Sequence, residues 1–534
     1  MKKNKSLFTR LPFFVLIFSI YPSLALLATN IREVDAIVVV RPLLLSILGA
    51  GVVVLLFLLF FKDWIRASLA TSVVLILFFS YGHLTRLLVD RFDPTLNKSI
   101  QQGLYLIQFG ILIFTLPWIR QRLVDAKNWL GSLNVIALVL ILFPVIQIAS
   151  FSFGIATNSD KPMATSTPEL VTESSQGTPA INPLPTSANP GRYPDVYLIV
   201  LDGYSRADTL EALGYDNSEF LNTLEEMGFY VAGCSRTTYR HTLLSMSSTF
   251  SMDYLWKVIP NTGVGDKNAA PLYEALIHNP VRSGFEQRGY TIVGFQTGYQ
   301  WDQWTDADYY LTLKDDTAND ETASSSITPF EYIFLRNTAI YPFIENSTLA
   351  AQRFYSHYRQ VNFTLDELPK IVSSIHGPKF VYAHIMSPHT PYIFLPDGSL
   401  NMDSRYYNTE TGTPSNLGLE IEGYINNIKY LNSRVPGILS DIIRNSEIPP
   451  IIVIQGDHGY VLPERRFNNL MAFYFPNGGN ASLYPTISPV NTFRLISNLY
   501  FGTNMHIRND ISLDADVGRP YAKEVVKPFP ETCP

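Results

Sequence analysis

Residues 451–459 (Ile-Ile-Val-Ile-Gln-Gly-Asp-His-Gly) constrain the fold more than any other stretch of the chain. Four consecutive β-branched residues predict a short strand buried on both faces, as in the middle of a parallel or mixed sheet. The strand ends at Gly456, so Asp457 and His458 fall at its carboxyl end, where α/β sheets place their ligands. A carboxylate beside an imidazole suits a divalent metal. The alternative is a plain polar turn.

Two further apolar runs end in polar residues in the same way. Residues 195–201 predict a strand that delivers Asp202 to a loop, with Gly203 directly after it. Residues 380–392 predict a third buried strand. His384 alternates with the residues of that strand and is interpreted as a core histidine, whereas His389 lies past the strand end, between two prolines, and is the better functional candidate.

A run of hydroxyl and basic residues, 234–242, precedes the small and apolar residues 243–248, which predict a buried helix. Thr242 therefore falls at a helix start, where backbone N–H groups and the helix dipole favour a bound anion. This position suits a nucleophile that attacks phosphorus or sulfur. The alternative is that the hydroxyls only cap the helix.

The other segments of this half of the chain alternate between helix and strand patterns. We expect a helix from about 216 to 227, an edge strand at 229–231, a helix and strand over 283–293, a strand at 471–475 and a helix at 490–500. The aromatic loop 298–304 suits either packing or a substrate site. Positive charge near the end of the 451–454 strand comes from the segment that holds Glu464, Arg465, Arg466 and Asn468.

The first 155 residues have the composition of a membrane anchor. The chain is 47% hydrophobic and only 16% charged, and five apolar stretches lie at about 11–28, 37–60, 67–81, 104–118 and 129–151. A membrane span needs about 20 mostly apolar residues. The third and fourth stretches are short, so we expect four to five spans. The first stretch fits a signal peptide or a retained anchor, and we favour the anchor because further spans follow it.

Basic residues predict the orientation of these spans. They gather before the first stretch, between the second and third, and between the fourth and fifth, so these sides are assigned to the cytoplasm. Five spans then leave the rest of the chain outside. Arg41 and His83 lie near span ends and are interpreted as interfacial residues. The net charge of -6 argues against a nucleic-acid partner.

Residues 155–192 are rich in Ser, Thr, Pro and Asn and predict a disordered tether. The sequence thus predicts three regions: a transmembrane anchor over 1–154, a linker over 155–192 and an α/β extracytoplasmic domain over 193–534.

Taken together, four ordered elements resemble the alkaline phosphatase and sulfatase superfamily. They are residues 201–203, the region of Thr242, residues 387–392 and residues 456–459. The anchor followed by an outside domain is similar to the membrane-anchored branch, the lipoteichoic acid synthases and lipid A phosphoethanolamine transferases. The resemblance covers about residues 193–505 and implies an α/β/α sandwich with a central mixed sheet.

The resemblance also implies roles for single residues. Asp202, Thr242, Asp457 and His458 would bind a divalent metal, Thr242 would be the nucleophile, and His389 would contact the transferred group. One divalent metal is expected, because no second group of histidines is evident. An oxygen-rich set with one imidazole favours Mn²⁺, with Zn²⁺ or Mg²⁺ as alternatives.

One motif departs from the superfamily. Residues 234–238 (Cys-Ser-Arg-Thr-Thr) lack the pattern that type I sulfatases convert to formylglycine, which argues against ordinary sulfatase activity. Cys234 and Cys533 are the only cysteines, and both fall on the oxidising side, so we expect them to pair.

The leading hypothesis is a metal-dependent phosphotransferase of the cell envelope. It would move a phospho-alcohol group from a phospholipid to an extracytoplasmic glycan or lipid acceptor through a covalent intermediate on Thr242. The alternatives are a phosphodiesterase or phosphatase that uses water, and a catalytically inactive metal-binding sensor or scaffold.

Overall fold

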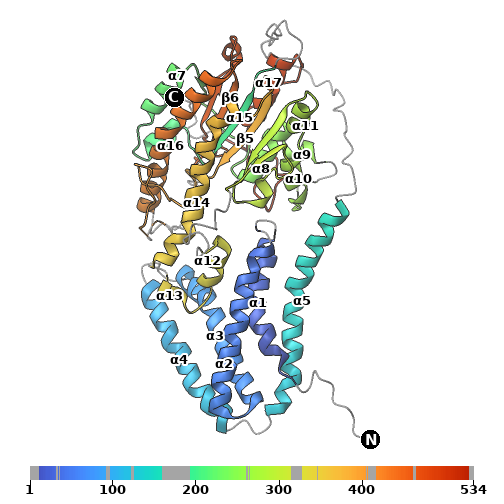
Figure 1. Cartoon of the computed structure of the whole chain (residues 1–534), viewed down its shortest axis with the longest axis vertical. Coiled ribbons are helices and arrows are strands. Elements are labelled where there is room, and N and C mark those ends of the chain that lie inside the picture. Colours follow the sequence, from blue (N-terminus) through green and yellow to red (C-terminus); the bar gives the residue numbers. More distant parts are fainter. Residues whose placement is uncertain are drawn as a thin grey trace. The chain divides into compact units, whose positions relative to one another are not determined.

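The computed structural model describes residues 11–31, 34, 36–91, 97–121, 126–158, 193–259, 263, 265–313, 327–344, 347–403, 406, 417–460 and 465–527. The chain divides into two compact units. The first comprises Met1–Val171 and Ser325–Arg353, and the second comprises Thr172–Ser324 and Phe354–Pro534. Figure 1 labels the elements of both units.

Long apolar helices make up most of the first unit: α1 (Phe13–Asn30), α2 (Val40–Phe61, preceded by the 3-10 turn η2, Ala36–Val39), α3 (Trp64–Arg91), α4 (Asn97–Gln121) and α5 (Ala126–Asn158). Among the described residues, five helices are long and apolar enough to cross a membrane. The two stretches that looked short in the sequence are the apolar middles of α3 and α4. Both helices extend beyond their apolar stretches into polar residues, and a search for apolar stretches does not detect these helix ends.

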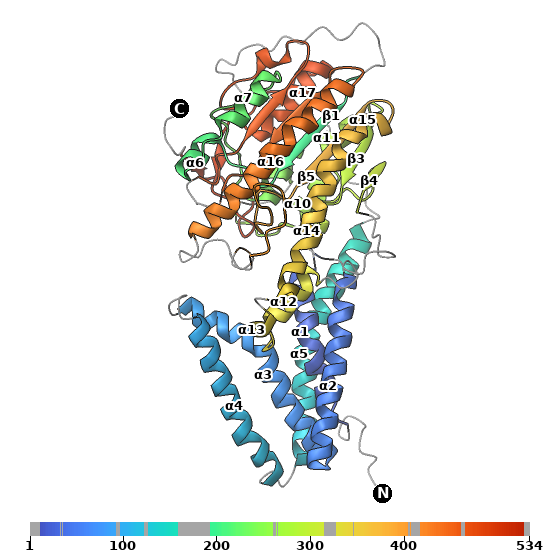
Figure 2. The same ribbon diagram turned by 60° about the vertical axis from the view of Figure 1, so that its left-hand side comes forward.

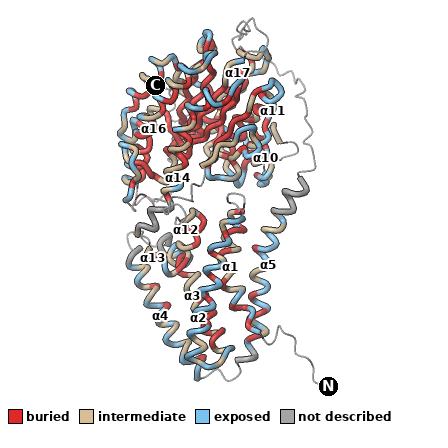
Figure 3. The backbone as a smooth tube through the Cα atoms, viewed as in Figure 1, coloured by how far each residue is buried: buried red, intermediate tan, exposed pale blue. Residues whose placement is uncertain are grey.

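The outward side chains of these helices are apolar. Figure 3 shows exposed positions along α2, α4 and α5. Many of them are large hydrophobic residues, and Leu59 and Phe114 reach 77% and 79% exposure. A water-soluble protein rarely exposes apolar surface on this scale. The pattern therefore fits helices whose solvent is lipid.

A segment from the middle of the sequence packs onto these helices. It holds the short helices α12 (Pro329–Arg336) and α13 (Tyr341–Ile344). The N–H of Gly82 donates to the carbonyl of Asn337 (3.1 Å), and the N–H of Ala339 donates to the carbonyl of Phe78 (2.9 Å). The sequence analysis includes this segment in the predicted 193–534 domain, whereas its contacts lie with the helices of the first unit. The composition of this segment does not differ from that of its neighbours, so the sequence did not indicate that it packs on the apolar helices.

An ion pair adds to this attachment. Arg41, at the second position of α2, pairs with Glu331 of α12 through both nitrogens of its guanidinium fork. Glu331 also closes a capping box with Thr328 at the start of α12. Arg41, which we interpreted as interfacial, thus has a protein partner.

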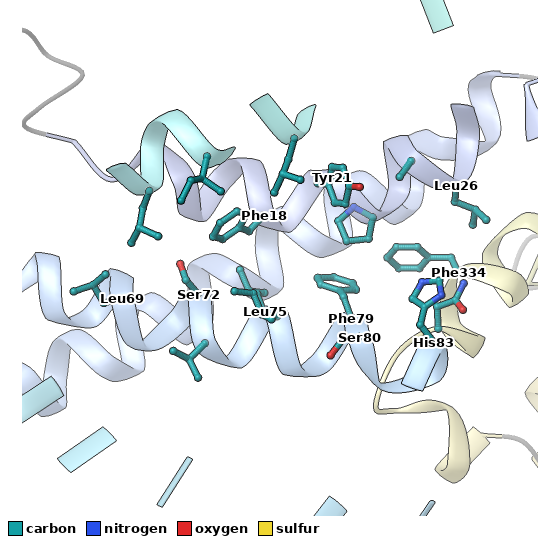
Figure 4. A pocket seen from close by; sticks show the side chains of 18 of the residues that line it. Phe18, Tyr21, Leu26, Leu69, Ser72, Leu75, Phe79, Ser80, His83 and Phe334 are labelled. Atoms are coloured by element: carbon teal, nitrogen blue, oxygen red, sulfur yellow. The ribbon is translucent and has the colours of Figure 1, made fainter. Parts of the chain in front are cut away.

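The first unit also contains an apolar cavity of about 820 Å³. Figure 4 shows Phe18 and Tyr21 of α1 and Phe79 of α3 lining it, with His83 and Phe334 at one end. His83, also interpreted as interfacial, lines this cavity.

A seven-stranded mixed sheet forms the centre of the second unit (Figure 2), in the order β2-β7-β6-β1-β5-β3-β4. Its strands are β1 (Val196–Leu201), β2 (Tyr230–Val231), β3 (Thr291–Phe295), β4 (Tyr309–Leu311), β5 (Lys379–Ile385), β6 (Ile451–Gln455) and β7 (Met471–Tyr474). β1 pairs in parallel with β5 and β6, and β7 runs antiparallel to β6 and β2. The carboxyl ends of β1, β5 and β6 therefore meet at one edge. A small hairpin joins β8 (Ser512–Leu513) to β9 (Val525–Val526).

Helices cover both faces of this sheet (Figure 1). One face packs against α8 (Thr242–Ser251), α10 (Ala270–Ile277), α11 (Pro280–Glu286) and α17 (Thr492–Phe501) in the main hydrophobic core. α16 (Leu417–Asn445) and the part of α14 (Thr348–Glu367) from Phe354 onwards lie on the opposite side. The shorter helices are α6 (Ala207–Ala212), α7 (Ser218–Glu226), α9 (Leu255–Val258) and α15 (Ile371–Ser374), with 3-10 turns η4 (Gln300–Asp302), η5 (Leu368–Lys370), η8 (Gly479–Ser482) and η9 (Pro489–Asn491).

The predicted fold class is confirmed: an all-α apolar unit and an α/β unit with a mixed central sheet between helices. Both faces of β1 and β6 are buried, as their unbroken apolar runs predicted. The expected strands at 229–231 and 471–475 form the edge pair β2 and β7. The predicted linker lies almost wholly outside the described residues, so the regional boundaries stay a prediction.

We expect Gly82→Val to weaken the attachment of the 327–344 segment. A Cβ at Gly82 would lie 2.2 Å from the carbonyl oxygen of Arg336, and overpacking of this kind costs about 1–3 kcal/mol. Thermal unfolding in detergent and limited proteolysis within 327–344 measure the effect. Gly110→Val on α4 is the matched control, because a Cβ there meets no atom within 4 Å. Equal stability of the two variants would contradict this account.

Candidate metal centre

Three loops at the carboxyl edge of the sheet bring the predicted site residues together. Asp202 follows β1, His389 lies four residues past β5, and Asp457 and His458 follow β6. The strands are in register, with Val200 opposite both His384 and Gln455, so their ends lie side by side. Thr242 joins them as the first residue of α8.

Glycines let these loops approach one another. Gly203 has a positive φ of 74°, a region that glycine enters at little cost, and its N–H donates to Asp457 Oδ1 (2.9 Å). A Cβ on Gly456 would lie 2.2 Å from the carbonyl oxygen of Tyr204. The turn after β6 thus needs glycine to bring Asp457 against the loop after β1.

The ligand atoms have the spacing of a metal site. His458 Nε2 lies 3.4 Å from Thr242 Oγ1, 3.5 Å from Asp457 Oδ2 and 3.7 Å from Asp202 Oδ1. Ligands bonded to one tetrahedral metal at about 2.0–2.1 Å stand about 3.3–3.4 Å from one another. A small relaxation would therefore place all four atoms around one ion.

The protonation pattern of His458 fits the same role. Its Nδ1 lies 2.8 Å from the carbonyl oxygen of Gly459, which can only accept a hydrogen bond, so Nδ1 carries the proton. Nε2 is then the ring nitrogen that faces the carboxylates. In His389 the same arrangement holds, because its Nδ1 lies 2.7 Å from the carbonyl oxygen of Thr390.

Two buried carboxylate oxygens in the centre lack donors. Asp202 Oδ1 and Asp457 Oδ2 have no hydrogen-bond partner within the part of the chain that the structure describes. Buried charges are normally paired or coordinate a metal. The orphaned oxygens and the free imidazole nitrogen fit a divalent cation.

The carboxyl groups perturb each other electrostatically. Burial and the adjacent Asp457 charge raise the pKa of Asp202 above its ordinary range. Burial also acts to raise the pKa of Asp457, but His458, His384 and the Gly203 N–H outweigh it, so the pKa of Asp457 is lowered. The pair thus resists carrying two negative charges unless a cation lies between them.

Basic residues surround the same edge. Burial, followed by the charge of Arg466, lowers the pKa of His241 to about 4, so this imidazole is neutral at pH 7. Burial lowers the pKa of Arg466, while Asp457 acts to raise it, and the guanidinium stays charged. Arg466 therefore supplies positive charge close to the carboxylates. Arg465 and Asn468, from the same predicted segment, instead bond to Asp208, and Glu464 lies outside the described residues.

Two other residues that could act as the nucleophile, Ser245 and Cys234, already have bonding partners. Ser245 is buried, donates to the carbonyl of Asp457 (2.6 Å) and pairs with Thr237 Oγ1 (2.8 Å). Cys234 is disulfide-bonded, which removes its thiol. Its predicted partner, Cys533, lies outside the described residues, so that pairing stays a prediction. Thr242 is the hydroxyl that faces the cluster.

Sequence reasoning missed two residues at this edge. His384, interpreted as a core histidine, is buried but points one ring nitrogen toward Asp202, at 3.8 Å. Asp302 of η4 is fully buried against His384. The aromatic loop that contains Asp302 mostly packs, since Trp304 is buried in the core. No sequence pattern connects Asp302 to β5, because the two meet only through the sheet topology.

We expect Asp202→Asn to raise the thermal stability of the metal-free protein while it abolishes metal binding. The substitution removes one of two buried like charges at neutral pH, and a gain of about 1 kcal/mol corresponds to no more than about 2 °C in Tm for a unit larger than 250 residues. Differential scanning calorimetry in a chelator measures the shift. Asp441→Asn, on the exposed surface of α16, is the control. A lower Tm for Asp202→Asn than for the control would contradict the predicted repulsion.

Several solved structures are similar to this chain. The C-terminal periplasmic domain of EcEptC from Escherichia coli, in complex with Zn, is 12% identical, covers 65% of this chain and 96% of its own, and has a TM-score of 0.41. Lipooligosaccharide phosphoethanolamine transferase A (EptA) from Neisseria meningitidis, an integral membrane protein, is 12% identical, covers 90% and 94%, and has a TM-score of 0.37. The lipoteichoic acid synthase LtaP from Listeria monocytogenes is 11% identical, covers 61% and 78%, and has a TM-score of 0.37. No family model and no curated protein matches the sequence.

Proposed function

We propose that this protein is a metal-dependent phosphotransferase that moves a phospho-alcohol group from a phospholipid to an extracytoplasmic glycan or lipid acceptor. The observation that carries the proposal is the position of Thr242. Its hydroxyl lies at the start of α8, 3.4 Å from His458 Nε2, beside two carboxylates with unpaired oxygens. A divalent metal held by these groups would activate this hydroxyl, and the start of α8 would favour an anionic substrate.

The transfer proceeds in two steps. Thr242 Oγ1 gives up its proton and attacks the donor phosphorus, an Oγ1–P bond forms, and the P–O bond to diacylglycerol breaks as the diacylglycerol oxygen takes up a proton. The acceptor hydroxyl then loses its proton, its oxygen bonds to the same phosphorus, and the Oγ1–P bond breaks as Thr242 regains a proton. A bound divalent metal lowers the pKa of the hydroxyl and offsets charge on the phosphoryl oxygens.

The residues around Thr242 orient these steps. Thr242 Oγ1 lies 3.4 Å from His458 Nε2, and this contact keeps its oxygen at the cluster. His389 presents Nε2 on the same side and would contact the transferred group. The charge of Arg466 favours an anionic substrate at this edge of the sheet.

The metal is assigned by ligand chemistry. Asp202, Thr242, Asp457 and His458 supply three oxygens and one nitrogen, which suits Mn²⁺ or Mg²⁺. The spacing of 3.4–3.7 Å also suits tetrahedral Zn²⁺. Among these, Mn²⁺ is our choice, because it tolerates both oxygen and imidazole ligands.

A phospholipid donor would explain why the catalytic unit is joined to apolar helices. Five helices able to span a bilayer keep the catalytic unit at the membrane surface. The distribution of basic residues assigns that surface to the extracytoplasmic side. The protein would therefore act on lipids of the outer face of its membrane.

We expect Thr242→Ala to abolish turnover while the fold and metal content remain, and Thr242→Ser to retain part of the activity. Loss of the nucleophile in a covalent mechanism lowers kcat by several powers of ten. The full-length protein is incubated with labelled phosphatidylglycerol or phosphatidylethanolamine, and diacylglycerol release is measured. Ser248→Ala, on the same helix, is the control, since its hydroxyl bonds to the carbonyl of Asp253 beyond the end of α8.

The dependence on acceptor separates the candidate functions. Release that requires an added glycan or lipid acceptor supports transfer. Release without an acceptor would identify a hydrolase, and no release from either lipid would leave a metal-binding sensor or scaffold. Normal turnover in Thr242→Ala would exclude the proposed nucleophile.

We also expect Ser174→Cys, in the predicted linker, to react with a membrane-impermeant thiol reagent in intact cells. Asp63→Cys, between α2 and α3, should react only after lysis, because that loop is assigned to the cytoplasm. The parent protein gives the background, with Cys234 held in its disulfide. The reverse labelling pattern would invert the assigned topology.

A further inference from the structure

Two polar side chains of α16 (Leu417–Asn445) contact the loops of the candidate metal centre. Tyr424 and Asn427 are both buried, and they lie three residues apart, so they share one face of the helix. α16 lies on the side of the sheet opposite α8, which begins at Thr242 (Figure 1). Helices on both sides of the sheet therefore contribute side chains to the centre.

The hydroxyl of Tyr424 bonds to the loop that carries Asp202. It donates to the carbonyl oxygen of Gly203 (2.8 Å) and accepts the N–H of Ser205 (3.0 Å). Gly203 directly follows Asp202, and its own N–H donates to Asp457 Oδ1 (2.9 Å). Both backbone groups of Gly203 are thus fixed, one by Tyr424 and the other by a carboxylate of the centre. Loss of the Tyr424 hydroxyl would free one of them and loosen the orientation of Asp202 and Asp457.

The side-chain amide of Asn427 bonds to both ends of the loop that carries His389. Its Nδ2 donates to the carbonyl oxygen of Pro388 (3.3 Å), and its Oδ1 accepts the N–H of Phe394 (3.0 Å). The N–H of His389 in turn donates to the carbonyl oxygen of Asp202 (2.9 Å). An apolar side chain in place of Asn427 would remove both hydrogen bonds from backbone groups in a buried position.

α16 approaches the second of these loops closely because Gly423 has no side chain. A Cβ at Gly423 would lie 2.6 Å from Cβ of Tyr392, which belongs to the loop that carries His389. Gly423 directly precedes Tyr424 in the helix. The close packing at Gly423 therefore fixes the place from which Tyr424 and Asn427 make their hydrogen bonds.

We propose that Tyr424 and Asn427 are positioning residues of the metal centre. Tyr424 sets the orientation of Asp202 and Asp457, and Asn427 sets the place of His389 beside them. This inference deepens the proposed function and rests on it, because His389 acts here as the contact of the transferred group. Residues that support metal ligands act on metal affinity, whereas residues that place a substrate contact act on the rate of transfer. The two side chains should therefore differ in what their loss changes.

Tyr424→Phe removes the hydroxyl and keeps the ring. We expect it to weaken Mn²⁺ binding about 10–100-fold, because the loop of Asp202 loses an outer hydrogen bond. Full-length protein in detergent is stripped with a chelator, and isothermal titration calorimetry measures its affinity for Mn²⁺ and, in a separate series, for Zn²⁺. Diacylglycerol release from the phospholipid donor should fall at limiting Mn²⁺ and recover at saturating Mn²⁺. An unfolded variant would not recover in this way.

Asn427→Ala should give the opposite pattern. We expect native affinity for Mn²⁺, because Asn427 bonds to the loop of His389, which is outside the proposed ligand set. The kcat of diacylglycerol release should fall about 10–100-fold with little change in KM, since a misplaced contact slows the transfer itself. Saturating Mn²⁺ should not restore this loss.

Tyr430→Phe and Asn362→Ala are the matched controls. Tyr430 also lies on α16, but its hydroxyl bonds to Asn362 of α14 and to Arg434 rather than to either loop. Each control loses the same chemical group as one of the test variants. Both should keep native Mn²⁺ affinity and native turnover, and thermal unfolding in a chelator shows how much stability each of the four variants has lost.

The outcomes separate positioning from plain structural support. Equal Mn²⁺ affinity in Tyr424→Phe and Tyr430→Phe would overturn the role of Tyr424, and native turnover in Asn427→Ala would overturn that of Asn427. Parallel losses of metal affinity, kcat and thermal stability in both test variants would show a structural role only and overturn the proposal.

Failure of the proposed function gives a different result. If the native protein releases no diacylglycerol, the proposed function and the role of Asn427 both fall, whereas calorimetry of Tyr424→Phe against Tyr430→Phe still decides the role of Tyr424. No binding of Mn²⁺ or Zn²⁺ by the native protein would overturn the metal centre and both positioning roles.

Discussion

The repulsion between Asp202 and Asp457 is the constraint on which the functional half of this protein depends. Two carboxylates meet in a buried position, and each has an oxygen without a hydrogen-bond donor among the described residues. Such a pair is unfavourable unless a cation lies between them. The imidazoles, the helix terminus and the guanidinium around the pair are all placed to complete a site for a cation and an anion together.

The fold imposes this closeness through the sheet. β1 is the central strand and pairs in parallel with β5 and β6. The three loops that follow these strands therefore lie next to one another at the same edge of the sheet. Both faces of β1 are packed under helices, and the burial of its apolar run contributes stability that offsets the unfavourable burial of two carboxylates at this edge. Glycine at 203 allows the positive φ of the first loop, and glycine at 456 avoids the clash that a Cβ would make with the carbonyl oxygen of Tyr204.

The central strands and much of the candidate site could be predicted, because both depend on local sequence patterns. The unbroken apolar runs at 196–201 and 451–454 predicted central strands, and the polar residues at their ends predicted the site. What the sequence could not show depends on contacts between distant segments. His384 follows the alternation of β5 and therefore looks like a core residue in the sequence. Its Nδ1 bonds to Asp302, which lies in η4, a distant segment of the chain, and only the folded structure shows this contact. The attachment of the 327–344 segment to α3 was equally hidden, since two of its hydrogen bonds join backbone groups that every residue carries.

The central claim is that Thr242 carries the transferred group, and peptide mass spectrometry tests it most directly. Full-length protein is incubated with a phospholipid donor and no acceptor, quenched in acid and digested. The account predicts a mass increase equal to the phospho-alcohol group on the peptide that contains Thr242, lost when acceptor is added before quenching. An adduct on another residue, such as Ser245 or His389, or an active protein whose Thr242 peptide is never modified, would contradict the account.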